Sequence, residues 1–358
     1  MRHAYFQSLV VLLSASRSAI AATYSLAKDY SGPTFFDDWV FYNNFDNLTN
    51  GDVIFVSAQV AASSKLAFVD PSSGHAIVKV DNTSTVPWND KRNSVRITTQ
   101  NEFAVGSVWV ADMFHVPYGC SVWPAWWSQA PSWPAGGEID TFEGVNLRTL
   151  NQMSLHTLPG CTQVSPTQTS SLINSTDCSS SSNNNQGCIV TDPSTDSYGA
   201  AFAAAGGGVF VTEYAQTGIS IWFFTRSAVP SSLSSGSNTL DTSTLGEPVA
   251  NWPTTGCDMD QFFGPQNLIL DITLCGDFAK PPNIFTQTCT GVCYDDWVVG
   301  NGSDYANAYF DVASIRIFNT NGSLPALPSG GGSHNGGVSI SQWQTTLLSA
   351  VVLAGILL

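Results

Sequence analysis

The sequence predicts an all-β fold, either a sandwich or a barrel, and three observations support this prediction. Short segments rich in β-branched and aromatic residues recur along the chain, as is typical of strands. Glycine, proline and asparagine separate these segments, whereas long amphipathic helix patterns are hard to find. About 300 residues run without an internal linker, and all-β domains commonly reach that length without splitting.

The predicted elements follow in chain order from a short helical turn at residues 31–39. Two stretches rich in Ser, Thr and Asn, residues 166–185 and 231–243, are expected to be loops, the first of them an exposed insertion. The expected strands are residues 66–69, 76–80, 94–99, 107–113, 138–142, 152–156, 209–213, 219–226, 267–273 and 308–318.

The first 22 residues resemble a secretory signal. Residues 1–22 combine a basic start at Arg2, an apolar run and a small-residue cleavage site at 19–21, which is the pattern of a signal peptide. Export agrees with the even number of cysteines, eight in all, because disulfides form in oxidising compartments. The cysteine pairing stays open, although Cys178 with Cys188 and Cys289 with Cys293 are close enough to be local partners.

The other end of the chain predicts a lipid anchor. Residues 323–337 form a Pro, Gly and Ser linker with a small-residue attachment site at 335–337, and Ser329 is a rival site. Residues 338–358 hold a mainly polar spacer and an apolar tail, the pattern of a GPI-anchor signal that is removed. A frayed apolar tail or a weak membrane helix is the alternative, but the tail is too short for a span of about 20 residues.

This organisation leaves residues 23–322 as one secreted domain, anchored at the plasma membrane or cell wall. A chain routed through the secretory pathway meets the glycosylation machinery, so the Asn-x-Ser/Thr tripeptides become candidate glycosylation sites. The five candidate asparagines are Asn47, Asn82, Asn174, Asn301 and Asn321.

Charge and composition exclude several partners and cofactors. The formal net charge is -15 with only 12 Lys and Arg, which argues against nucleic acid, because phosphate backbones demand clustered basic residues. An uncharged polysaccharide imposes no such requirement. The His and Cys residues lack paired metal-ligand spacing, so we expect no metal and no cofactor. No Gly-x-Ser-x-Gly motif is present, which weakens the case for a serine hydrolase but leaves it open. We also expect a monomer whose only membrane attachment is the lipid anchor.

Three carboxylates within six residues are the strongest chemical signal. In a regular strand Glu138 and Asp140 share one face, whereas Glu143 points to the other. One extra residue near Thr141 or Phe142, a β-bulge, would return Glu143 to the face of the other two acids. Two carboxyls about 5 Å apart are the machinery of a retaining glycosidase. The alternative is that these acids are simply solvated on an exposed strand.

Four tryptophans directly upstream favour the catalytic interpretation. Trp123, Trp126, Trp127 and Trp133 lie within sixteen residues of a chain that has 11 Trp in total. Flat aromatic rings suit the apolar faces of sugars, and the indole N–H adds a hydrogen-bond donor. For any single tryptophan, packing in the core remains the alternative.

Residues 138–143, Glu-Ile-Asp-Thr-Phe-Glu, resemble the Glu-x-Asp-x-x-Glu signature of glycoside hydrolase family 16. Residues 119–127, 151–156, 198–208 and 221–226 resemble the fungal-type endo-β-1,3(4)-glucanases of that family, which include the laminarinases. The resemblance implies a concanavalin-like β-sandwich, or jelly roll, of two curved antiparallel sheets with the glucan in a concave cleft. It also implies hydrolysis with retention.

The resemblance also implies roles for the acids. Glu138 is expected to be the nucleophile, Glu143 the general acid/base, and Asp140 a hydrogen-bonding partner that orients Glu138. His156 matches the family's histidine near the acid/base and is expected to bond Glu143, with an ordinary strand histidine as the alternative.

The same resemblance assigns substrate binding to two tryptophans. Trp123 matches a cleft tryptophan that stacks on glucose, and Trp127 is the weaker candidate for the same role.

The resulting hypothesis is an endo-glycosidase that cleaves β-1,3 and mixed β-1,3(4) glucans through a covalent glycosyl-enzyme intermediate. Lichenases and the cell-wall chitin-glucan transglycosylases of the family have one residue fewer before the last Glu, so the longer spacing here favours a laminarinase-like enzyme. A wall transglycosylase is one alternative. A catalytically silent glucan-binding wall protein is the other, since fold alone does not give function.

Overall fold

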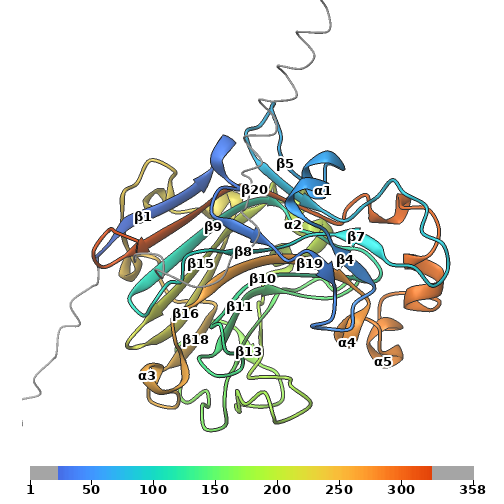
Figure 1. Ribbon diagram of the computed structural model, residues 1–358. Helices are drawn as coiled ribbons and strands as arrows, with labels where there is room; N and C mark the ends of the chain where they lie inside the picture. Colours follow the sequence, from blue (N-terminus) through green and yellow to red (C-terminus); the bar gives the residue numbers. More distant parts are fainter. Residues whose placement is uncertain (1–22, 325–358) are drawn as a thin grey trace, which may run out of the picture.

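In the computed structural model, residues 23–324 are described, and they form two large stacked β-sheets edged by short helices (Figure 1). The expected signal peptide and anchor signal, and all but the start of the expected linker, lie outside the described residues. Within the described part, no helix has the length and apolar character needed to cross a membrane.

The first sheet has nine strands, all paired antiparallel. Its main path runs in the order β17-β1-β20-β9-β15-β16-β18, and β6 pairs with β20 and carries β5. The strands are β1 (Thr23–Ser31), β5 (Ala67–Val69), β6 (Ala76–Lys79), β9 (Ser107–His115), β15 (Gly208–Ala215), β16 (Gly218–Thr225), β17 (Thr239–Asp241), β18 (Ala250–Pro253) and β20 (Tyr309–Asn319).

The second sheet has eight antiparallel strands in the order β13-β14-β12-β11-β10-β19-β8-β2. These are β2 (Trp39–Phe41), β8 (Arg96–Thr99), β10 (Val122–Gln129), β11 (Glu138–Glu143), β12 (Gln152–His156), β13 (Ser171–Leu172), β14 (Val190–Thr191) and β19 (Asn267–Leu274). A small third sheet joins β3 (Asn44–Phe45), β4 (Val53–Phe55) and β7 (Arg92–Ser94).

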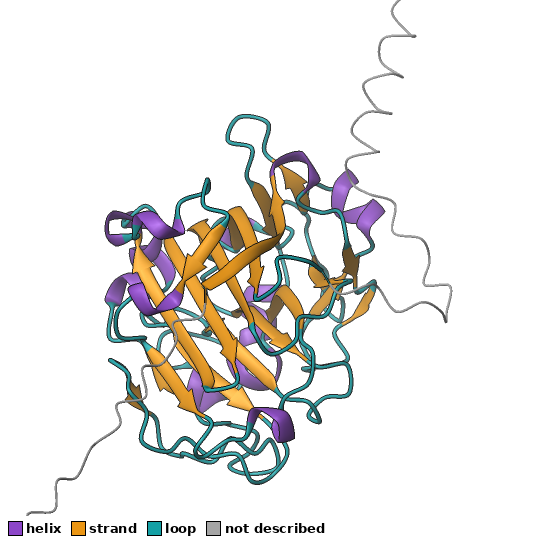
Figure 2. Ribbon diagram, turned by 90° about the vertical axis from the view of Figure 1, so that its left-hand side faces the viewer, coloured by secondary structure: helices purple, strands orange, loops and turns teal. Residues whose placement is uncertain are grey.

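The helices are short and lie around the sheets with the loops (Figure 2). The α-helices are α1 (Ala58–Ser63), α2 (Gly199–Ala204), α3 (Met259–Phe262), α4 (Gly276–Ala279) and α5 (Pro282–Phe285). The other helical turns are η1 (Gly32–Thr34), η2 (Thr195–Ser197), η3 (Arg226–Ala228), η4 (Ser231–Leu233), η5 (Thr242–Thr244), η6 (Cys293–Val298) and η7 (Ser303–Tyr305).

The main hydrophobic core lies between the two large sheets and draws side chains from both. At its centre Phe142 of β11 packs against Phe210 of β15 and Phe310 of β20, with ring centroids 5.5 and 6.0 Å apart. Beside it, the hydroxyl oxygens of Thr141 and Thr212 are hydrogen-bonded at 2.6 Å across the two sheets. The strand that carries the three acids is therefore fixed from behind by the opposite sheet.

The all-β prediction and every expected strand are confirmed, with boundaries within a few residues. The sequence missed β10, in the middle of the second sheet, where Pro124 pairs with Ile272 of β19. Proline has no backbone N–H to donate to a neighbouring strand and is therefore normally found on edge strands. Its presence at residue 124 argued against a strand in the middle of a sheet. The short strands β13 and β17 were also missed, since both lie in polar stretches expected to be loops. Six further strands lie outside the expected ranges: β1, β2, β3, β4, β14 and β18.

Four disulfides use all eight cysteines. The local pair Cys178–Cys188 is confirmed, and Cys161 pairs with Cys257. The expected pair of Cys289 with Cys293 is wrong, as the two bond instead to Cys120 and Cys275 respectively. Antiparallel pairing of β10 with β19 brings residues 120–122 beside residues 274–275. The segment 289–293 reaches both, so one of its cysteines bonds to Cys120 and the other to Cys275.

All five candidate glycosylation asparagines lie outside the helices and strands, four of them in loops between strands and Asn321 just after β20. Asn82 is half-buried, and its side-chain oxygen accepts a hydrogen bond from the ammonium of Lys79 at 2.7 Å. The four exposed asparagines are Asn47, Asn174, Asn301 and Asn321.

Candidate active site

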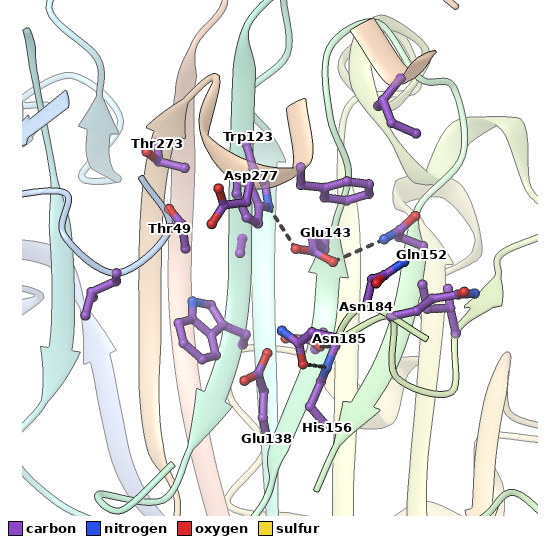
Figure 3. Close-up of a pocket in the computed structure, with 18 of the residues that line it drawn as sticks. Thr49, Trp123, Glu138, Glu143, Gln152, His156, Asn184, Asn185, Thr273 and Asp277 are labelled. Atoms are coloured by element: carbon purple, nitrogen blue, oxygen red, sulfur yellow. Dashed lines mark hydrogen bonds and ion pairs between the residues drawn. The ribbon is translucent and has the colours of Figure 1, made fainter. Parts of the chain in front are cut away.

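A cavity of about 850 Å³ lies over the second sheet, within the usual range for ligand sites (Figure 3). All six residues that the sequence singled out for catalysis or sugar binding line this one cavity: Trp123, Trp127, Glu138, Asp140, Glu143 and His156.

A bulge in β11 brings the three acids together. The pairing of β11 slips by one residue between Asp140 and Phe142 on the β10 side and between Asp140 and Glu143 on the β12 side. Thr141 and Phe142 are consequently both fully buried in the core. Because two successive residues point inward, Glu143 returns to the face of Glu138 and Asp140. The bulge prediction is confirmed.

Glu138 is held by two hydrogen bonds. The indole N–H of Trp133 donates to its Oε2, and Asp140 shares a second hydrogen bond with it. Burial, followed by the charge of Glu143, raises the pKa of Glu138 to about 7, while the two hydrogen bonds act in the opposite direction. Trp133 is 41% exposed, so this contact lies at the edge of the cavity.

Asp140 is the most deeply buried of the three acids, with 3% of its surface exposed. The hydroxyl of Ser154 donates to its Oδ2 at 2.5 Å, and Nε2 of His156 lies 3.5 Å from the same oxygen. Burial, followed by the charge of Glu138, raises the pKa of Asp140 well above its ordinary value. A protonated Asp140 can donate the shared hydrogen bond to Glu138 and so favours the charged form of Glu138.

Glu143 is clamped at both carboxyl oxygens. The indole N–H of Trp123 donates to Oε1 at 2.8 Å, and the amide of Gln152 donates to Oε2 at 3.1 Å. Burial, followed by the charge of Asp140, raises the pKa of Glu143 to about 7, and the two donors oppose this rise. The site thus has one carboxyl fixed in place that can hold a proton near neutral pH.

The expected bond from His156 to Glu143 is not formed. In the β11–β12 register His156 lies opposite Glu138, and Gln152 lies opposite Glu143 and takes the contact expected of the histidine. His156 instead faces Asp140 and lies 3.3 Å from the hydroxyl of Ser154. The sequence held a signal for Gln152, since residues 152, 154 and 156 share one face of a strand.

The two predicted tryptophan platforms line the cavity with their indole N–H groups already bonded. Besides its bond to Glu143, Trp123 packs edge-on against Phe278 with centroids 5.5 Å apart. Trp127 donates to Asp271 at 3.1 Å, and the guanidinium of Arg96 lies 4.9 Å from its ring centroid.

Arg96 and Asp271 form an ion pair at 2.8 Å beside Trp127. Both line the cavity, and the sequence analysis missed them. One member lies on β8 and the other on β19, so only the sheet pairing could have shown their contact.

One wall of the cavity is a loop that the sequence placed on the exposed surface. Asn183, Asn184 and Asn185 line the cavity in successive left-handed conformations, with φ of 50°, 57° and 59°. Asparagine tolerates this region better than most residues. Asn185 Oδ1 lies 3.1 Å from Nδ1 of His156, and a Cβ on Gly187 would lie 2.9 Å from the same ring. The Cys178–Cys188 disulfide closes this loop.

The facing wall comes from the α4 region and the loop before β4, where Asp277 and Thr49 lie across from Asn184 (Figure 3). The side-chain amide of Asn50 donates to both carboxyl oxygens of Asp277, at 3.1 and 2.9 Å. The Cys275–Cys293 disulfide fastens the chain directly before α4.

The sequence model of one family, described as "XgeA-like, catalytic GH16 domain", matches residues 39–318. A probable glycosidase of Schizosaccharomyces pombe is 39% identical over 302 residues, which cover 83% of this chain and 70% of that protein. The endo-1,3(4)-beta-glucanase xgeA of Emericella nidulans is 34% identical over 315 residues, covering 84% of this chain and 48% of its own. The chain therefore spans about half the length of that curated glucanase.

Solved structures of glycoside hydrolase family 16 are also similar to this chain. The GH16 Laminarinase 16A from Phanerochaete chrysosporium, solved with β-glucans in donor and acceptor sites, is 37% identical with a TM-score of 0.79. An elongating GH family 16 β-1,3-glucosyltransferase is 35% identical with a TM-score of 0.76. Each match covers 83% of this chain and 100% of the other.

The raised pKa of Glu138 predicts a pH-dependent cost to stability. The folded chain binds this proton more tightly than the unfolded one, so the free energy of unfolding falls as pH rises from about 4.3 to about 7. We expect Glu138→Gln to be more stable than the parent chain at about pH 8, by on the order of 1 kcal/mol, and equally stable at about pH 4.

Denaturant unfolding across this pH range measures the difference. Glu247→Gln, at an exposed glutamate outside the cavity, is the matched control and should show no such trend. A Glu138→Gln chain that is no more stable than the parent at the higher pH would contradict the assignment.

Proposed function

Because the chain belongs to glycoside hydrolase family 16, we propose that it is a retaining endo-β-1,3(4)-glucanase. The observation that carries the proposal is the placement of Glu138 and Glu143 on one face of β11, each held by its own hydrogen-bond donors. The family resemblance assigns attack to Glu138 and proton transfer to Glu143, and the contacts of Asp140 with Glu138 agree with that division.

The proposed reaction has two steps. Glu138 attacks the anomeric carbon while Glu143 gives its proton to the departing glycosidic oxygen, which leaves a covalent glycosyl-enzyme. Glu143, now ionised, removes a proton from water, the water attacks the same carbon, and Glu138 departs. Two displacements at one carbon retain its configuration. The proton of Asp140 stabilises the carboxylate of Glu138 before attack and after release.

The proposed substrates are β-1,3 and mixed β-1,3(4) glucans. The curated relatives named endo-1,3(4)-beta-glucanase and the glucan-bound laminarinase support this class. Tryptophans and side-chain amides on the cavity walls suit a neutral sugar chain, since indole faces take its apolar faces and amides take its hydroxyls. The binding roles of Trp123, Trp127 and His156 belong to the same proposal.

Substitution of the two glutamates separates their roles. We expect Glu138→Gln to lose nearly all release of reducing sugar from laminarin, since no covalent intermediate can form. Glu143→Ala should lose about 10²-fold or more on laminarin, and azide should restore turnover of an activated aryl glycoside because it needs no general base. Glu247→Gln is the control, and near-normal hydrolysis by Glu138→Gln would refute the nucleophile assignment.

A wall transglycosylase is the second candidate, because the elongating glucosyltransferase is nearly as similar to this chain as the laminarinase. The two activities differ only in whether water or a sugar hydroxyl takes the glycosyl group.

We expect laminarin oligomers to give shorter products when these are sized by chromatography. Products longer than the starting oligomer would favour transfer, and tight binding without any new product would favour a binding protein.

We further propose that the protein is secreted, glycosylated at the five candidate asparagines, and held at the plasma membrane or cell wall by a GPI anchor. The composition of residues 1–22 and 323–358 supports this location. We also propose that it acts as a monomer, because the acids and the donors that hold them all come from one chain and the reaction requires no second copy. A phospholipase specific for phosphatidylinositol anchors should release the protein from membranes, and retention after treatment would contradict the anchor.

A further inference from the structure

Asn151 is a fully buried residue whose polar groups are all used. It lies directly before β12, and its side chain bonds two backbone groups of β11. Its Oδ1 accepts from the N–H of Glu143 at 2.9 Å, and its Nδ2 donates to the carbonyl of Thr141 at 3.0 Å. Its own N–H donates to the hydroxyl of Ser197 at 3.0 Å, and its carbonyl accepts from the N–H of Asp192 at 2.9 Å.

Asn151 bonds backbone groups at the bulge itself: Thr141 has no partner residue on β10 or β12, and Glu143 is the residue at which the pairing with β12 resumes. Between Asp140 and Glu143 the pairing with β12 skips one residue, so backbone groups inside the bulge lose their partners on that strand. A buried N–H or carbonyl without a partner destabilises the fold. The side chain of Asn151 supplies one acceptor and one donor at this point and so closes the gap.

The segment that anchors Asn151 also supports the bulge through an aromatic contact. Tyr198 follows Ser197, and its ring stacks on Phe142 with centroids 5.2 Å apart and planes 16° apart. A Cβ on Gly144 would lie 2.5 Å from the same ring, so only glycine fits after Glu143. The residues on both sides of Glu143 are therefore packed by one tyrosine, and its backbone N–H is bonded by one asparagine.

We propose that Asn151 is a positioning residue that fixes the Glu143 carboxyl by bridging the bulge. Asn151 is not among the residues that line the cavity, so it acts through the backbone and not on the sugar. This inference rests on the proposed function, in which Glu143 protonates the departing oxygen. A displacement of about 1 Å in a catalytic group can lower a rate about 10²-fold, so a bond that holds the backbone of Glu143 affects the rate directly.

The experiment compares two leaving groups in the full-length protein. Loss of general-acid assistance slows cleavage of laminarin, whose alkoxide needs a proton, but barely affects a 2,4-dinitrophenyl β-laminaribioside, whose phenolate departs without one. For Asn151→Ala we expect kcat/KM to fall about 10²-fold on laminarin and less than about fivefold on the aryl glycoside. The ratio of kcat/KM for the two substrates is the readout.

Asn146→Ala is the matched control. Asn146 is also fully buried, and its side chain likewise bonds two backbone groups, the N–H of Ser121 at 2.8 Å and the carbonyl of Ala279 at 3.1 Å. Its replacement removes the same side chain and leaves the same kinds of groups unpaired, but away from the bulge. We expect a similar loss in thermal unfolding and the same ratio of kcat/KM for the two substrates as in the parent chain.

An Asn151→Ala enzyme that loses activity equally on both substrates would overturn the positioning role, because general destabilisation lowers both rates together. If that variant does not fold, Asn151→Asp takes its place, since it keeps the acceptor for the Glu143 N–H and loses the donor to Thr141. It should show the same selectivity in weaker form, and an equal loss on both substrates overturns the inference. A parent chain inactive on both substrates would refute the proposed function, and the inference with it.

Discussion

The single extra residue in β11 is the constraint on which the site depends. Side chains of a strand alternate between its faces, so Glu143 would lie in the core if the alternation from Glu138 continued. The bulge instead turns Thr141 and Phe142 inward together, and both meet side chains of the opposite sheet. The bulge therefore determines both the core contacts of Thr141 and Phe142 and the position of the Glu143 carboxyl on the opposite face.

The same arrangement explains why the charged forms of the three acids are unfavourable in the folded protein. Three carboxyls on one buried face raise each other's pKa, because burial penalises their charged forms and each charge opposes the next. The surrounding hydrogen-bond donors do not remove the cost of burying these charges, but they act differently on the two glutamates. Trp133 and Asp140 stabilise a charge on Glu138, while Trp123 and Gln152 fix the orientation of Glu143.

The sequence could predict the positions of the catalytic acids better than the contacts that residues far apart in the chain make around the cavity. Spacing within 138–143 required the bulge, and strand alternation placed the acids, so local geometry was enough there. His156 was paired with the wrong acid, because its partner depends on the register of β11 with β12, which no local pattern fixes. The Arg96–Asp271 pair and the Cys120–Cys289 disulfide join residues 175 and 169 positions apart, and only the folded sheet brings them together.

The walls and the floor of the cavity are stabilised by different means. The floor is sheet, held by ladder hydrogen bonds and by the core behind it. The walls are loops and short helices, and each is fastened by a disulfide, Cys178–Cys188 on one side and Cys275–Cys293 on the other. Since a disulfide limits the freedom of the unfolded chain, it favours the folded position of these wall segments in addition to their packing contacts. The walls are thereby free to carry amides and carboxylates toward the sugar, while the sheet, together with Trp133 and Asn151 beside it, positions the reacting acids.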